Sequence, residues 1–221
     1  MRDRIKLMIA GLLIAMLSAC GGGGGGGGDE SSGTTGVRVL HGAIDAVPVE
    51  LVTDTSIEFQ SARYGDAGGY RPLGGGTHLL TLYPAKSRSE VLLTQSVVNA
   101  GDQKFTVLFF GNRDTLGLQS TVIAEDRPEV PDSAGLVRGI HAVGGAGGLD
   151  FVIGSATAST TFGKASSYVD VAAGIQPFLV RRAADRLVLA RGSVTVEQGR
   201  AYTVFAGGEA GYLVSTQILD E

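Results

Sequence analysis

The sequence has a single cysteine, no tryptophan and few aromatic residues, which make up 6% of the chain. One cysteine excludes an intrachain disulfide, so a folded part of this chain must be stabilised by its apolar core. Hydrophobic residues form 43% of the sequence, which is enough for such a core. The absence of Trp argues against the aromatic platforms on which many β-sandwich proteins bind glycans.

Positive charge is also scarce, with 18 Lys and Arg against 22 Asp and Glu. If residues 1–19 are removed as a signal peptide, 15 basic residues remain against 21 acidic ones. We expect no nucleic-acid partner, because binding nucleic acid requires a basic face. The apolar run at residues 7–17 is shorter than the roughly 20 residues that a helix needs to cross a bilayer.

The N-terminus has the three parts of a secretory signal: a basic start, the apolar residues 7–17, and the small residues Ser18 and Ala19. Residues 17–20, LSAC, resemble a bacterial lipobox. In a lipobox the cysteine thiol is joined to diacylglycerol, the chain is cut before it, and the new amine is acylated with a fatty acid such as palmitate. We therefore predict a lipoprotein signal peptide at residues 1–19 and lipidation of Cys20, which anchors the protein in a membrane. An ordinary secreted protein is the alternative.

Eight glycines follow Cys20 directly. Polyglycine has no side chain to bury and a large backbone entropy, so residues 20–35 are predicted to be a flexible tether with a mean reach of roughly 20–24 Å. In Gram-negative lipoproteins an Asp after the acylated cysteine favours the inner membrane. Because Gly21 occupies that position here, the resemblance implies the cell outer membrane, facing either the periplasm or the exterior.

Two parts of the chain repeat each other. VRVLHGAIDAVPVELV at residues 37–52 and VRGIHAVGGAGGLDFVI at residues 137–153 share Val, Arg and His at a spacing of 100 residues, and later matches keep the same order. We predict two copies of one unit at residues 36–126 and 135–221, joined by an exposed linker at residues 127–134 that is rich in proline and acidic residues.

Apolar residues in both units recur with a period of two. In THLLTLY, residues 77–83, alternate side chains share one face, whereas KFTVLFFG, residues 104–111, is apolar on both faces, as in a central strand. Glycine-centred turns separate these runs at short intervals. The pattern predicts an all-β protein with two tandem antiparallel β-sandwich domains of the immunoglobulin-like class, each with about seven short strands.

The segment RVLHGAIDAVPVEL, the later Tyr-Gly and the Gly-x-x-(x)-aromatic-Thr-Val strand resemble the bacterial domain of unknown function 4397 (DUF4397), over residues 36–221. That family is found in exported proteins, often as tandem copies behind a signal or lipobox. Its first strand reads close to VHASPDAPAVDV, and His41, Asp45, Pro48 and Glu50 match this pattern. The resemblance implies a fold and brings no established activity.

The candidate site residues are the two recurring histidines and the nearby carboxylates. His41 with Asp45 or Glu50, and His141 with Asp150, could form a weak ligand or metal site at the end of the first strand of each repeat. Alternatively, each imidazole is half-buried and fixes the loop after its strand. We favour the second interpretation because the repeat retains His and loses Asp45. No zinc-type cluster is evident and we expect no cofactor.

No nucleophile elbow, phosphate-binding loop or zincin helix is present in the sequence, so we predict that the protein is not an enzyme. The main hypothesis is a lipid-anchored cell-envelope protein that acts as a surface scaffold or binds a protein partner. A carbohydrate-binding lipoprotein is the first alternative and a hydrolase or metal-dependent enzyme is the second. The aromatic residues Tyr64, Tyr70, Phe162 and Tyr168 recur at matched positions, which fits packing better than a sugar platform.

Overall fold

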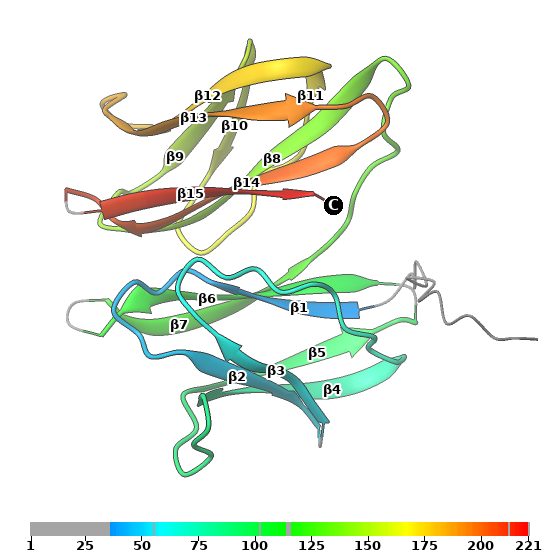
Figure 1. Cartoon of the computed structure of the whole chain (residues 1–221), viewed down its shortest axis with the longest axis vertical. Coiled ribbons are helices and arrows are strands. Elements are labelled where there is room, and N and C mark those ends of the chain that lie inside the picture. The colour runs from blue at the N-terminus through cyan, green and yellow to red at the C-terminus, as the bar shows by residue number, and fades with distance from the viewer. Residues whose placement is uncertain (1–35, 55, 102, 114–115, 212, 221) are drawn as a thin grey trace, which may run out of the picture. The chain divides into compact units, whose positions relative to one another are not determined.

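A computed structural model of the chain describes residues 36–220, apart from residues 55, 102, 114–115 and 212 (Figure 1). The predicted signal peptide, Cys20 and the glycine tether lie outside the described residues. The described part belongs to one compact unit. Among its elements there is no helix with the length and apolar character needed to cross a membrane.

The first repeat forms two sheets that pack as a sandwich. One sheet has the order β1-β6-β7 and the other the order β3-β2-β4-β5. The strands are β1 (Gly36–His41), β2 (Val49–Thr53), β3 (Ser56–Ala62), β4 (Gly76–Pro84), β5 (Leu93–Asn99), β6 (Lys104–Asn112) and β7 (Gly117–Ala124).

The second repeat has the same arrangement with one further strand. Its sheets have the orders β11-β8-β14-β15 and β10-β9-β12-β13. The strands are β8 (Ala134–Gly144), β9 (Leu149–Ile153), β10 (Ala156–Thr160), β11 (Val169–Ala172), β12 (Gly174–Arg182), β13 (Val188–Val196), β14 (Ala201–Glu209) and β15 (Leu213–Asp220). The all-β sandwich predicted from the sequence is confirmed. In the first repeat the place of β11 is taken by an isolated bridge between Val37 and Arg71, and a second bridge, Leu40 with Ala67, matches the bridge of Ile140 with Ala165 in the second repeat.

Each sandwich encloses its own apolar core. In the first repeat, alternate residues of β1 and β6 meet alternate residues of β2 and β4, and the largest of these include Leu51, Leu80, Leu82 and Phe109. In the second repeat Phe151, Phe178 and Tyr202 fill the equivalent space. Burying a side chain of this size contributes about 1.5–3 kcal/mol, so these alternating residues account for the pairing of the sheets.

One strand pair in each repeat departs from the antiparallel pattern. β1 pairs with β6 in parallel, with His41 opposite Phe109, and β8 pairs with β14 in parallel, with His141 opposite Ala206. The other strand pairs are antiparallel. A parallel pair cannot be closed by a hairpin, so β1 meets β6 only after the chain has built the opposite sheet.

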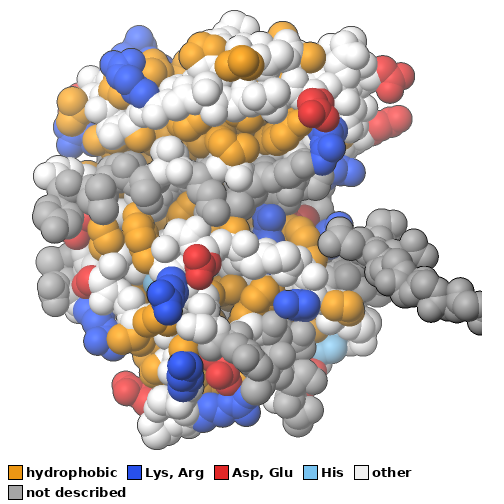
Figure 2. Space-filling view, viewed as in Figure 1, with side chains coloured by type: hydrophobic (Ala, Val, Ile, Leu, Met, Phe, Trp, Pro, Cys, Tyr) orange, Lys and Arg blue, Asp and Glu red, His pale blue; other side chains and the backbone are white. Residues whose placement is uncertain are grey.

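Basic and acidic side chains are interspersed over the face shown in Figure 2. Mixed charge of this kind is typical of a solvated surface.

Candidate functional site

The two recurring histidines lie at equivalent places in the sandwiches, and both are fully buried. The Nε2–H of His41 donates to the carbonyl oxygen of Val47 at 3.2 Å, and the Nε2–H of His141 donates to that of Gly147 at 2.7 Å. Each ring therefore fixes the loop that follows the first strand of its repeat. Each imidazole makes a T-shaped contact with an aromatic ring, with centroid distances of 4.9 Å to Phe109 for His41 and 5.6 Å to Phe162 for His141.

The second ring nitrogen distinguishes the two histidines. The backbone N–H of Val143 donates to Nδ1 of His141 at 3.0 Å, whereas Nδ1 of His41 has no hydrogen-bond partner among the described residues. Burial lowers the pKa of His141 from its ordinary 6.5 to about 4, and burial likewise lowers the pKa of His41. Both imidazoles are therefore neutral at pH 7, and the hydrogen bonds of His141 require the tautomer with its proton on Nε2.

The three predicted carboxylates are engaged with other residues. Asp45 accepts a hydrogen bond from the backbone N–H of Arg113 at 2.8 Å. Glu50 pairs with Nε of Arg88 at 2.7 Å. Asp150 accepts from Nε of Arg181 at 3.2 Å and from the hydroxyl of Ser159 at 2.8 Å. Among the described residues, no group of three or more His, Cys, Asp or Glu side chains is placed to hold a metal ion.

Replacing Asp150 with Ala is expected to lower the free energy of unfolding by about 1 kcal/mol, because its pair with Arg181 is partly shielded from water. Urea denaturation measures the change. Asp185→Ala, which removes the more exposed pair with Arg182, is the matched control and should give a smaller change. A gain in stability on losing Asp150 would contradict a structural role, since carboxylates kept for a ligand often cost stability.

A second group of polar residues lies where the repeats meet. Glu125, just after β7, contacts two arginines at equivalent positions of the two repeats: Nη2 of Arg38 lies 3.6 Å from its Oε1, and Nη2 of Arg138 bonds its Oε2. The side chains are buried, with exposed fractions of 4% for Arg38, 3% for Arg138 and 6% for Glu125. One carboxylate thus joins the first strand of one repeat to the first strand of the other.

Each arginine is held in the same way by its own repeat. Nε of Arg38 donates to the hydroxyl of Thr106 at 2.8 Å, and Nε of Arg138 donates to that of Thr203 at 2.9 Å. The Arg38 guanidinium lies 4.7 Å from the centre of the Tyr70 ring, and the Arg138 guanidinium lies 4.8 Å from that of Tyr168.

Two of the recurring tyrosines therefore stack on recurring arginines, a contact worth about 0.5–2 kcal/mol.

An apolar cluster adjoins these arginines and draws on both repeats. It contains Leu40, Leu108, Phe110 and Ile123 from the first repeat, and Ile140, Ala142 and Phe205 from the second. These side chains point away from the two sandwich cores. The face of β6 that does not line its own core is thus covered by the other repeat, which explains why KFTVLFFG is apolar on both faces.

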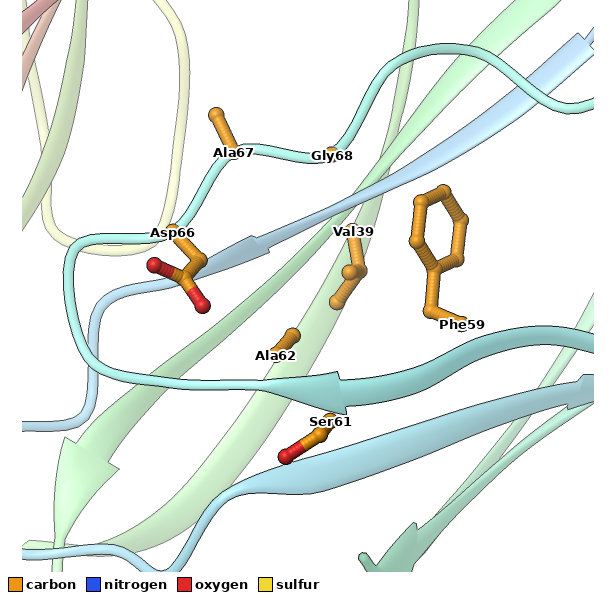
Figure 3. A pocket seen from close by; sticks show the side chains of 7 residues that line it. All are labelled: Val39, Phe59, Ser61, Ala62, Asp66, Ala67 and Gly68. Carbon is orange, nitrogen blue, oxygen red and sulfur yellow. The ribbon is translucent and has the colours of Figure 1, made fainter.

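A separate cavity of about 370 Å³ opens at the side of the first sandwich (Figure 3). Val39 of β1 and Ala62 of β3 line it, Phe59 stands at one side, and the Asp66 carboxylate points into it. A second hollow, of about 410 Å³, lies between the segment that follows β7 and the second repeat, where Asp126 and Pro128 face Arg138 and Tyr168. Both are open to solvent and could admit a small ligand.

The sequence of this chain matches a family model described as "Domain of unknown function (DUF4397)" over residues 35–152 and again over residues 135–221. The chain belongs to the DUF4397 family. The two matches overlap, and the first continues past the linker into β8 and β9. No curated protein matches this DUF4397 chain.

Among the solved structures with remote similarity to this DUF4397 chain is the crystal structure of CBMbc (family CBM26) from Eubacterium rectale Amy13K in complex with maltoheptaose. It is 8% identical, with a TM-score of 0.27, and the match covers 84% of this chain and 96% of that chain. A TM-score this low gives no basis for assigning that module's ligand to the DUF4397 chain.

Sequence reasoning did not single out Glu125, the residue on which both DUF4397 repeats converge. The signal that could have found it was the recurrence of Arg38 as Arg138, since two buried arginines at matched positions require a carboxylate. The same spacing drew attention to His41 and His141, whose rings instead contact the carbonyls of adjacent loops.

Proposed function

We propose that this protein is a non-catalytic, lipid-anchored component of the bacterial cell envelope that acts as a surface scaffold or binds a protein partner. The observation that carries the proposal is that the recurring polar residues make contacts that hold the fold together. The histidines hold loops, and the arginines join the repeats through Glu125. Because these histidines and arginines are engaged in holding the fold, the protein is suited to offering its surface to a binding partner.

The anchor in this proposal is Cys20, which lies outside the described residues. The lipobox-like LSAC and the glycine tether support it, and Gly21 supports the outer membrane as the destination. Three acyl chains hold a protein on a membrane effectively permanently, because each buried methylene contributes about 0.8 kcal/mol and two anchors already suffice. The tether then allows the two sandwiches to turn while staying near the membrane.

Cell fractionation tests the anchor. Wild-type protein is expected in the membrane fraction, and Cys20→Ser in the soluble fraction. Ser31→Ala, a substitution in the tether, is the control and should remain with the membrane. If Cys20→Ser stays as membrane-bound as the wild type, the lipoprotein proposal fails, whatever the sandwiches bind.

A carbohydrate-binding function is the second candidate, and the cavity of the first repeat favours it. There an aromatic ring, Phe59, and a carboxylate, Asp66, lie on opposite sides of an open space, which suits the apolar face and the hydroxyl groups of a sugar (Figure 3). A glycan array probed with soluble Cys20→Ser protein distinguishes the candidates. Specific binding lost in both Phe59→Ala and Asp66→Asn would displace the scaffold proposal.

A further inference from the structure

The two repeats contact each other through equivalent surfaces. We call this the shared face; its outward residues are Leu40, Gly42, Leu108 and Phe110 in the first repeat and Ile140, Ala142, Phe205 and Gly207 in the second. The registers of β1 with β6 and of β8 with β14 make these residues equivalent, position by position. A contact between the same face of two similar units has approximate twofold symmetry, as in an isologous dimer.

Large side chains on one half of the shared face meet small residues of the other repeat. A Cβ atom at Gly42 would lie 2.7 Å from Cβ of Ala142 and 2.9 Å from Cζ of Phe205, so the two backbones approach closely there. In the opposite direction, the Phe110 ring packs edge-on against Phe162 at 4.9 Å and covers Gly163. Such fitted packing is typical of a specific interface.

Polar contacts flank this apolar centre. On one side Glu125 bonds Arg138 of the second repeat and lies near Arg38 of the first. Asn112, at the other end of β6, donates from Nδ2 to Oε2 of Glu209 at the end of β14, at 3.1 Å. An apolar centre with polar contacts at its edge is the usual anatomy of a stable protein interface.

The shared face lies on the strands, and the middle of the linker is exposed. Between Ala124 and Ala134, residues such as Pro128, Glu129 and Asp132 are exposed. The contacts that join the repeats come instead from the strands and from Glu125.

We propose that the shared face is a self-association surface whose partner is a second copy of the same repeat unit. It holds the two repeats together without the linker, and a repeat can bind its counterpart from another molecule in the same way. Two molecules that meet can then exchange repeats, as domain-swapped proteins do. This inference is independent of the anchor and of any ligand.

The test uses full-length Cys20→Ser protein in which linker residues 129–131 are replaced by a protease recognition sequence. After cleavage at micromolar concentration, the two fragments are expected to co-elute in gel filtration as a 1:1 complex by light scattering. Mixing with a cleaved copy that carries a mass tag on its second repeat should give mixed pairs by native mass spectrometry.

A double variant, Phe110→Asp with Phe205→Asp, should separate the fragments while the uncleaved chain keeps its β-sheet circular dichroism. Glu125→Arg is a second variant, which leaves both apolar halves of the shared face intact and brings three guanidinium groups together. It should raise the dissociation constant of the two fragments at least tenfold. The proposal is overturned if the wild-type fragments separate on cleavage, folded or unfolded, or if both variants co-elute as tightly as the wild type.

Discussion

Replacing Glu125 with Gln is expected to lower the free energy of unfolding by about 3–5 kcal/mol, the cost of removing one partner from a buried ion pair. The substitution keeps the shape of the side chain and removes the charge that Arg38 and Arg138 share. Both arginine side chains are almost fully buried, so water replaces little of the lost interaction with the carboxylate. The loss is as large as the whole contribution of a substantial core side chain.

Urea denaturation measures this loss, because guanidinium salts would screen the charges under study. Glu129→Gln is the matched control: it removes the same charge from an exposed linker position, and surface substitutions of that kind change stability by less than about 0.5 kcal/mol. Equal unfolding midpoints for the two variants would show that Glu125 does not join the repeats.

Acidification from pH 6.5 to pH 4 is expected to remove about 3 kcal/mol of stability through His141 alone. Its pKa falls from 6.5 in the unfolded chain to about 4 in the folded protein, because burial disfavours the charged imidazole. A lowered folded pKa means that the unfolded chain binds the proton more tightly. The stabilisation is therefore complete above pH 6.5 and is lost as the pH falls towards 4. His41 acts in the same direction.

Comparing the stability that the wild type and His141→Gln lose on acidification isolates the effect of His141 from that of other groups that titrate in the same pH range. The variant is expected to be less stable at pH 7 and to lose less stability on acidification. His78 is the control residue, because its hydrogen bond to Asp54 raises its pKa. The stability that protonated His78 contributes is therefore present below pH 6.5 and is lost as the pH rises through the raised pKa. An equal acid loss in the wild type and His141→Gln would refute the role of His141.

Much of the fold could be predicted because it is encoded locally. The alternation of residues 77–83 predicts which side chains of this strand face the core, and β4 buries Leu80 and Leu82 there. The order of matched residues predicted two copies of one unit, and the family model matches the chain twice, over residues 35–152 and 135–221. The parallel pairing of β1 with β6 was not predictable in this way, because no hairpin or short turn links strands so far apart in the sequence.

The site was harder to predict than the fold because burial depends on the other repeat. Glu125 stands beside the acidic linker, where a carboxylate is normally solvated. It is buried only because the two repeats come together around it. The roles of His41 and His141 likewise depend on carbonyl groups six residues further along each loop, and a backbone carbonyl leaves no trace in the sequence.

The close approach at Gly42 also limits how this gene can change. Any enlargement at Gly42 has to be matched by a smaller residue at Ala142 or Phe205, and both lie in the other copy. We therefore expect the two halves of the gene to change together where β1, β6, β8 and β14 meet. Neither copy can change alone on this surface, because a substitution in one repeat is tolerated only if the facing residues of the other repeat leave room for it.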